Sequence, residues 1–154
     1  IKDPFDRFSD IAGLRAIFYN SEDLEKAVRL IEKSGDFVNF SDGKKLQGDD
    51  KSSEYGYRAV HLDAILNPKK RGQLNEYQNL IGTPCEIQFT TVFAHAWSKT
   101  YHALSYKENR KVNLPEEEQK NLDNAFVAAA ANLKRIEEDI TKLSKRFHPG
   151  KNKK

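Results

Sequence analysis

Residues 84–104 read PCEIQFTTVFAHAWSKTYHAL, and this stretch decides the fold because its pattern changes once, from that of a strand to that of a helix. Pro84–Thr90 is a short run, rich in apolar residues, that follows Gly82, which predicts a strand. From Thr91 the large apolar residues recur at helical spacing, at Phe93, Trp97, Tyr101 and Leu104. We expect this stripe to face the core, and a second stripe to face a cleft or solvent, formed by His95, Lys99, His102 and Tyr106.

Upstream of this stretch, the sequence predicts three more strands and one helix. The apolar run Ile11–Tyr19 predicts a buried strand, and Ser21–Gly35 has the acidic first turn and the apolar spacing of an amphipathic helix. Further strands are expected at Phe37–Phe40 and Arg58–Leu66, separated by a polar loop without periodicity (41–53). A loop of this length in a compact domain is usually functional or mobile.

Downstream, a last helix begins between Asn113 and Glu117 and carries an apolar seam that alternates steps of four and three residues. The seam consists of Leu122, Phe126, Ala129, Leu133, Ile136, Ile140, Leu143 and Phe147. Such a pattern is typical of a coiled coil. It predicts either packing back on the domain or a homo-oligomer formed through this helix, and we place a boundary between residues 1–112 and 113–154.

Composition narrows the class of protein. With 154 residues, 38% hydrophobic residues and a net charge of +3, the sequence predicts one soluble, cytoplasmic domain rather than a disordered chain. No apolar run approaches the roughly 20 residues of a membrane span, and the single cysteine, Cys85, excludes an internal disulfide framework. Local basic clusters at 69–71 and 151–154 are candidate anion contacts. Methionine is absent even at position 1, so we expect the sequence to begin after the natural translation start.

Two carboxylates near predicted strands are candidates for chemistry. Glu86 lies inside a strand, where a charge is expensive to bury unless it is paired or binds a cation. Gln88 shares its face, which would give the sheet a polar patch. Asp10 stands directly before the first strand, and a carboxylate pair from adjacent strands would suit Mg²⁺ together with substrate phosphates. In the alternative interpretation neither residue takes part in chemistry: Asp10 is a cap and Glu86 is an exposed residue of an edge strand.

A second candidate group surrounds the entry to the strand at 58–66. Tyr57 and His61 are four residues apart, so strand alternation puts them on one face, where a ring could stack on a nucleobase and an imidazole could bind phosphate. His95, at the start of the following helix, could reach the same face. In the alternative reading, Tyr57 and His61 are ordinary buried residues. The four histidines lack zinc-ligand spacing, and there is no Walker loop, nucleophile elbow or Cys-x-x-Cys.

In combination, four ordered motifs resemble the RelA/SpoT-type synthetase domain, from about residue 6 to 107. The motifs are Ser9-Asp10-Ile11-Ala12-Gly13-Leu14-Arg15, Gly56-Tyr57-Arg58-Ala59-Val60-His61, Glu86-Ile87-Gln88-Phe89-Thr90-Thr91, and His95-Ala96-Trp97 with the residues to Lys107. The last helix is similar to the extra helix of the single-domain small alarmone synthetases. The resemblance implies an α/β (α+β) fold, with a nucleotidyltransferase-like mixed sheet flanked by helices and a long C-terminal helix.

The resemblance also implies an activity: transfer of pyrophosphate from ATP to the 3′-hydroxyl of GDP or GTP, which makes (p)ppGpp in the stringent response. Asp10 then corresponds to a Mg²⁺-binding aspartate, and Glu86 to a glutamate that contacts the metal region and acts as general base. Arg15 corresponds to an arginine that packs on the ATP adenine, and Tyr57 to a tyrosine that stacks on guanine. The remaining positions line the acceptor-nucleotide pocket: His61, Gln88 and His95.

The sequence departs from the family pattern in three places. Only nine residues precede Asp10, so we expect the helix that holds the ATP phosphates to be missing from residues 1–112. Thr90 stands where the family usually has arginine, and Tyr55 replaces a small or amide residue. Two other functions therefore stay open. One is a toxic relative that makes adenosine alarmones or pyrophosphorylates the 3′ end of tRNA, and the other is a catalytically silent nucleotide sensor or RNA-binding module.

Overall fold

The computed structural model describes residues 11–43, 45–52, 58–105 and 115–147. Their elements, in chain order, are β1 (Ala12–Phe18), α1 (Ser21–Ser34), β2 (Phe37–Asn39), β3 (Asp49–Ser52), β4 (Arg58–Leu66), η2 (Arg71–Gln73), η3 (Asn75–Leu80), β5 (Cys85–Thr91), α2 (Val92–Ser105) and α3 (Glu116–Phe147). The residues form two compact units: Ile1–Ala16 with Leu24–Asp50 and Val60–Phe89, and Ile17–Asp23 with Lys51–Ala59 and Thr90–Lys154. The boundary predicted between residues 112 and 113 lies outside the described residues.

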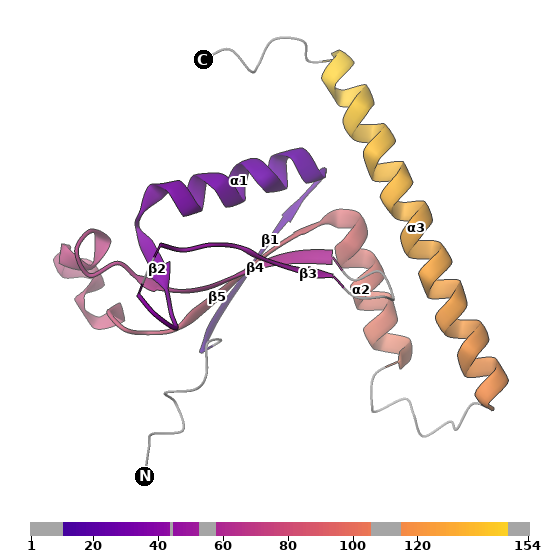
Figure 1. The fold of residues 1–154 in the computed structure, drawn as a ribbon, viewed down its shortest axis with the longest axis horizontal. Coiled ribbons are helices and arrows are strands. Elements are labelled where there is room, and N and C mark those ends of the chain that lie inside the picture. The colour runs from indigo at the N-terminus through magenta and orange to yellow at the C-terminus, as the bar shows by residue number, and fades with distance from the viewer. Residues whose placement is uncertain (1–10, 44, 53–57, 106–114, 148–154) are drawn as a thin grey trace. The chain divides into compact units, whose positions relative to one another are not determined.

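The first unit contains most of a mixed sheet with the strand order β1-β5-β4-β2, and β3 also pairs with β4 (Figure 1). β4 runs antiparallel to both β5 and β2. β1 runs parallel to β5, since the Ala12 amide donates to the Pro84 carbonyl at 3.2 Å and, three residues further on, Arg15 contacts Gln88. The predicted fold class, a mixed sheet with helices and a long C-terminal helix, is confirmed.

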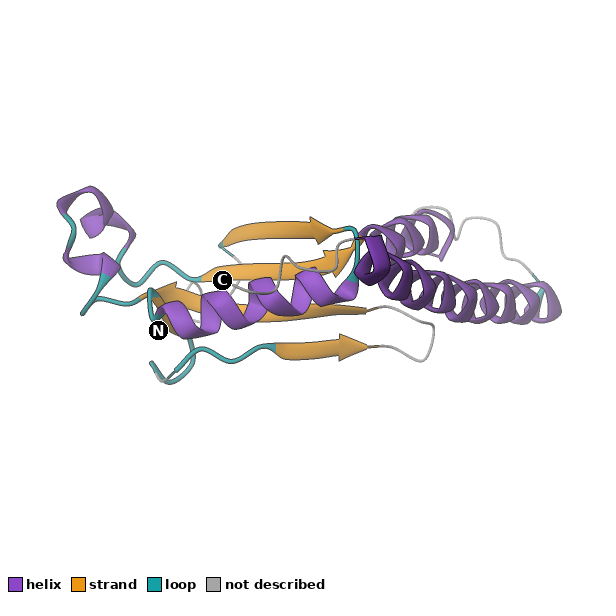
Figure 2. Cartoon of the chain, turned by 90° about the horizontal axis from the view of Figure 1, so that it is seen from above, coloured by secondary structure: helices purple, strands orange, loops and turns teal. Residues whose placement is uncertain are grey.

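The strand register gives the sheet one apolar and one polar face. Leu62 pairs with Ile87 and Ala64 with Cys85, while the alternate pairs are His61 with Gln88 and Asp63 with Glu86. Because paired residues point to the same side of a sheet, the two sets lie on opposite faces. Helix α1 lies over one face (Figures 1 and 2). Its buried Val28 and the apolar-face residue Val60 both approach Gly48, so α1 covers the apolar face.

Local sequence signals explain the bounds of α1. The side chain of Asn20 accepts a hydrogen bond from the Asp23 amide at 2.9 Å, so Asn20 rather than Ser21 caps the helix. Acidic Glu22 and Asp23 occupy the first turn, where they suit the positive end of the helix dipole. Gly35, with φ of +68°, follows the last residue and adopts the left-handed conformation that glycine tolerates best.

Two sequence-based expectations about this unit are wrong. β1 is not buried: within the described residues it pairs with β5 alone, and Leu14 and Ile17 are 58% and 48% exposed. The loop at 41–53 contains β3 and the bridge residue Lys45, which pairs with Val38. The basic residues 69–71 lie in the turn after β4 and at the start of the first of two short 3₁₀ helices, η2 and η3, for which the sequence pattern gives no prediction.

The second unit contains α2 and α3, which pack against each other. The Trp97 indole donates to the Phe126 carbonyl at 3.0 Å, and the Trp97 ring stacks on Tyr101 at 5.0 Å. Trp97 and Phe126 are buried, as the two apolar stripes predict, whereas Leu104 is 53% exposed and lies outside the core. No helix within the described residues is long and apolar enough to cross a membrane.

The seam of α3 is covered along part of its length only. Phe126 is buried, but Ile136, Ile140 and Leu143 are more than 40% exposed. A carboxylate that the seam pattern left out is buried in their place: Glu137 accepts a hydrogen bond from the Thr91 hydroxyl at 2.9 Å. Packing of this helix within its own unit therefore buries Phe126 and leaves the seam residues Ile136, Ile140 and Leu143 exposed.

Candidate functional site

Four of the predicted site residues form one hydrogen-bonded row on the polar face of the sheet. Arg15 of β1 donates from Nε and Nη2 to Oε1 of Gln88, at 2.8 and 2.5 Å. The amide nitrogen of Gln88 donates in turn to Oε2 of Glu86, on the same strand. On the other side, Nδ1 of His61 lies 2.7 Å from Oε1 of Glu86. The row thus crosses three adjacent strands, β1, β5 and β4.

Each link of the row fixes the next. An ionised carboxylate only accepts hydrogen bonds, so the contact between Nδ1 of His61 and an ionised Glu86 requires the proton of the imidazole to be on Nδ1. Because Arg15 holds the carbonyl oxygen of Gln88, the amide nitrogen faces Glu86. The side chains of His61 and Glu86 are 14% and 22% exposed, so the carboxylate is half-buried yet open to solvent. The row presents a carboxylate with both oxygens oriented.

The other predicted site residues are not joined to this row in the described part of the chain. Asp10 and Tyr57 lie outside the described residues, and so does Tyr55. His95 lies in the first turn of α2, in the second unit, where it is half-buried. The proposed roles of these residues therefore stay predictions.

Thr90, which stands where the family usually has arginine, is buried at the end of β5. Its hydroxyl donates to the Arg58 carbonyl at 3.1 Å, and the residue is 4% exposed. A small hydroxyl side chain satisfied by the backbone of β4 supplies no positive charge at this position. Any cation that binds phosphate must come from another residue.

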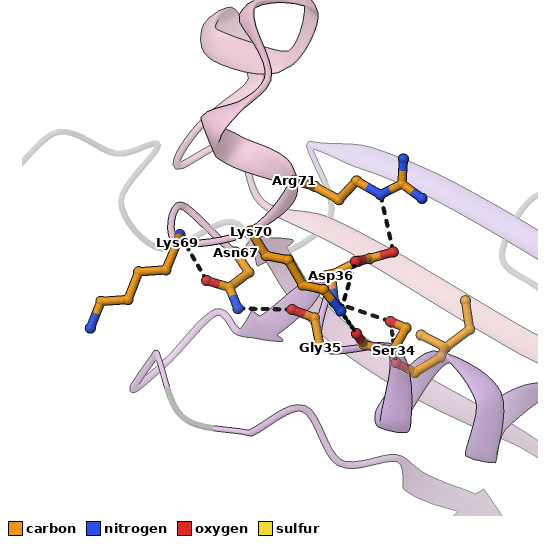
Figure 3. A network of polar contacts seen from close by, with 8 residues as sticks. Ser34, Gly35, Asp36, Asn67, Lys69, Lys70 and Arg71 are labelled. Atoms are coloured by element: carbon orange, nitrogen blue, oxygen red, sulfur yellow. Dashed lines mark hydrogen bonds and ion pairs between the residues drawn. The ribbon is translucent and has the colours of Figure 1, made fainter.

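The basic cluster at 69–71 is mostly engaged within the protein (Figure 3). Asp36 pairs with Lys70 at 3.4 Å and with Arg71 at 3.1 Å. Desolvation would raise the pKa of Asp36, but hydrogen bonds from Arg71 and Lys70 outweigh it and hold that pKa below its usual range. Lys70 also donates to the Ser34 carbonyl at the end of α1. Ion pairs with Asp36 leave less positive charge here for an RNA backbone than the sequence indicates.

The predicted Mg²⁺ site can be tested on its donor set. Within the described residues there is no group of three or more His, Cys, Asp or Glu side chains that could hold a metal ion. Mg²⁺ does not require one, because one or two carboxylates plus substrate phosphates commonly bind it. Glu86 provides one such carboxylate on the polar face. The residues fit Mg²⁺ bound mainly through a nucleotide, with Asp10 as the second protein ligand to be tested.

The sequence predicts the four residues of the row but not the hydrogen bonds between them. The family resemblance implies a place for Arg15 on the ATP side and for Gln88 on the acceptor side, and the structure adds a direct hydrogen bond between the two. The hydrogen bond forms because the parallel register of β1 and β5 puts residues 15 and 88 side by side. Nothing in a single sequence reveals that offset.

Comparison with known proteins bears on the family and the fold of the chain. Residues 2–111, most of the chain, match the family model described as the region found in RelA / SpoT proteins. No curated protein sequence matches the chain. Several solved structures are similar to it at low sequence identity.

The small alarmone synthetase 1 from Bacillus subtilis has a TM-score of 0.67 at 20% identity, covering 92% of this chain and 66% of that one. Its complex with its product pppGpp has a TM-score of 0.65 at 21% identity, covering 93% and 66%. A GTP pyrophosphokinase family protein from Streptococcus pneumoniae has a TM-score of 0.64 at 21% identity, covering 92% and 62%.

These likenesses establish the fold. The chain spans only 62% to 66% of the length of these three structures. The family match rests on sequence and extends across all the strands that carry the polar row. This chain therefore belongs to the family defined by the region found in RelA and SpoT proteins.

Proposed function

We propose that this chain transfers the pyrophosphoryl group of ATP to the 3′-hydroxyl of GDP or GTP, as a (p)ppGpp synthetase. The observation that carries the proposal is the row from Arg15 through Gln88 and Glu86 to His61, in a chain of the RelA/SpoT family. A guanine nucleotide is favoured as acceptor because the similar B. subtilis synthetase binds pppGpp as its product.

Glu86 is the proposed general base. Its carboxylate takes the proton of the acceptor 3′-hydroxyl while that oxygen attacks the β-phosphorus of ATP, and the bond from that phosphorus to the α-phosphate oxygen breaks to release AMP. Both carboxylate oxygens already accept one hydrogen bond, yet each keeps a lone pair for an incoming proton. The neighbours of Glu86 therefore orient the base without blocking it.

The proposed contacts of Arg15 are compatible with its place in the row. Its hydrogen bonds to Gln88 use the edge of the planar guanidinium, whereas packing on adenine uses the face. Arg15 thus connects the donor nucleotide to Glu86 through a single amide side chain. Binding of ATP would then stiffen the link that orients the base.

The remaining roles are assigned from the family resemblance. Tyr57 stacks on guanine, and His61, Gln88 and His95 line the acceptor pocket. Asp10 and Glu86 would hold Mg²⁺, which neutralises the charge of the phosphates when it is bound. The ordering of two polyanions against one carboxylate is what pyrophosphoryl transfer requires of a protein.

The test is a turnover assay with the full chain, ATP, Mg²⁺ and either GDP or GTP, followed by separation of the nucleotides. The proposal predicts AMP and a 3′-pyrophosphorylated guanosine in equal amounts. Glu86→Gln should remove most of the turnover, because the amide keeps the shape but cannot accept the proton. Failure to form either product with any guanine nucleotide would exclude the proposal.

Asp63→Asn provides a matched control. Asp63 is the register partner of Glu86 on the neighbouring strand, and it is exposed on the same face. The substitution removes the same charge beside the site without removing the proposed base, so activity should be kept. Equal loss of turnover in both variants would mean that turnover depends on the negative charge of this face rather than on proton transfer to Glu86. Labelled pyrophosphate that moves from ATP to tRNA but not to free GTP would identify an RNA acceptor instead.

A further inference from the structure

A pocket lies on the face of the sheet opposite to the polar row. It has a volume of about 510 Å³ and is formed within the first unit, where the end of β4 meets the starts of β1, β2 and β5. Cys85 lines it, and its side chain points away from the side of the neighbouring Glu86 because successive residues in a strand alternate. The pocket is therefore separated from the candidate active site by the thickness of the sheet.

The walls of this pocket are mainly apolar. Phe37 and Leu66, which pair across β2 and β4, form one side, and Leu80 and Tyr77 of η3 form another. Leu80 is 48% exposed, so the pocket keeps an apolar surface in contact with solvent. Volumes of about 300–1,000 Å³ with apolar linings are typical of sites for small molecules.

Two charged groups, Arg71 and Asp36, line this otherwise mainly apolar pocket (Figure 3). Arg71 lines the pocket together with Asp36, and its Nε donates to Oδ2 of Asp36 at 3.1 Å. Within the described residues, Nη1 and Nη2 of Arg71 make no hydrogen bond or ion pair. Figure 3 shows the Nε of Arg71, and neither terminal nitrogen, joined to Asp36 by a dashed line.

The charges around Arg71 favour an anion. Asp36 carries one negative charge, and it is paired with two cations, since Lys70 contacts its other oxygen at 3.4 Å. One positive charge is left over in this group of three, and Glu76, a further carboxylate that acts on Arg71 through space, forms no ion pair with it within the described residues. The terminal nitrogens of a guanidinium are suited to bind a carboxylate, sulfonate or phosphate with two parallel hydrogen bonds.

We propose that this pocket binds a small amphipathic anion, with an aromatic or aliphatic body against Phe37, Leu66 and Leu80 and one anionic head group on Arg71. The inference uses only the pocket and its rim, so it holds or fails independently of the proposed pyrophosphoryl transfer. The ligand class is defined by the combination of an apolar cavity with a single guanidinium at its edge.

Two fluorescent probes with the same aromatic body test the proposal. 8-Anilinonaphthalene-1-sulfonate carries one anionic group, and N-phenyl-1-naphthylamine lacks it. The first should bind the full chain saturably with one site. Arg71→Gln should weaken its binding by about tenfold or more, as expected for a lost hydrogen-bonded charge pair, and leave the uncharged probe within about twofold. Leu66→Trp should reduce the binding of both probes, because the larger ring fills the pocket.

Lys69→Gln is the matched control for Arg71→Gln. Lys69 belongs to the same turn and has the same charge, but within the described residues only its backbone amide makes a hydrogen bond. If local positive charge alone attracted the sulfonate, the two variants would behave alike. The proposal requires that only Arg71→Gln weakens the anionic probe, with unchanged circular dichroism in both variants.

Cys85 gives an independent measure of where the probe sits, because it is the only cysteine of the sequence and lines the pocket. Burial and the adjacent Glu86 raise the pKa of this thiol, so alkylation with N-ethylmaleimide is best followed at mildly alkaline pH. At a probe concentration ten times the Kd, alkylation should slow by about tenfold. Absence of saturable binding, equal weakening by Arg71→Gln and Lys69→Gln, or an unchanged alkylation rate would each overturn the proposal.

Discussion

The hydrogen bond between Thr91 and Glu137 should be a measurable source of stability in the second unit. Thr91 ends β5 and caps α2, since its hydroxyl oxygen accepts a hydrogen bond from the Ala94 amide at 3.3 Å. The same hydroxyl donates to Oε2 of Glu137 at 2.9 Å, and both residues are only 5% exposed. One side chain therefore joins the start of α2 to the middle of α3.

The expected magnitude follows from this burial. A hydrogen bond to a charged group contributes about 1.5–3 kcal/mol, and a buried hydroxyl left without its partner adds a desolvation penalty. Glu137→Ala should therefore lower the free energy of unfolding by about 1.5–3 kcal/mol. Thr91→Val removes the same bond and also the cap of α2, which is worth about 1 kcal/mol more. In a double-mutant cycle the two changes should couple by about 1.5 kcal/mol or more.

Urea unfolding followed by tryptophan fluorescence suits this measurement. Trp97 is the only tryptophan of the sequence, and it is buried between α2 and α3 in the same unit. Glu138→Ala is the matched control, because Glu138 is the exposed neighbour and its loss should change stability by less than about 0.5 kcal/mol. A coupling energy below about 0.5 kcal/mol, or equal effects of the two alanine variants, would refute the reasoning.

Three further predictions concern the nucleotide site, the basic turn and the last helix. Tyr57→Ala should raise the acceptor KM, with a smaller effect on kcat, because about 1–3 kcal/mol of stacking free energy is lost. An unchanged KM in steady-state assays would contradict the role of Tyr57. The lowered pKa of Asp36 means that its charged form stabilises the fold above its unfolded value of 3.8 and that this stability is lost as the pH falls through the folded-state pKa. Urea unfolding of Asp36→Asn should accordingly depend less on pH in this acidic range than the parent chain. Ile140→Glu on the exposed stripe of α3 should convert a homo-oligomer into monomers in light scattering, and a parent chain that is monomeric at every concentration would refute self-association.

The sequence predicts which polar side chains share a sheet face better than it predicts the exposure of the strands. Alternation alone places Glu86 and Gln88 on one face of β5, and the structure adds His61 from the paired position on β4. β1 has as many apolar residues as a central strand, yet Leu14 is mostly exposed. The number of strands that flank a segment is a property of the topology, and apolar content does not encode it.

Long-range pairing also explains the elements that the sequence hides. β3 consists of polar residues, and its pattern is that of a loop, but backbone bonds to β4 make it a strand. Leu46 lies in the same polar segment and is 2% exposed. Likewise, the seam of α3 predicts which face is apolar, but it does not predict that Glu137 finds a hydroxyl partner. In each case the deciding partner lies in another element.

The alternation of β5 makes the two proposals of function separable by experiment. Glu86 and Gln88 point to the polar face, whereas Cys85 belongs to the wall of the pocket on the other face. Substitution of Glu86 should abolish turnover and leave probe binding at Arg71 intact, while Leu66→Trp should do the reverse if the pocket is independent of catalysis. If filling the pocket also changes turnover, β1, β4 and β5 are the candidate routes for the effect, because each of these strands contributes residues to both faces. Measuring both activities in both variants therefore distinguishes a separate ligand site from one that is coupled to the orientation of Glu86.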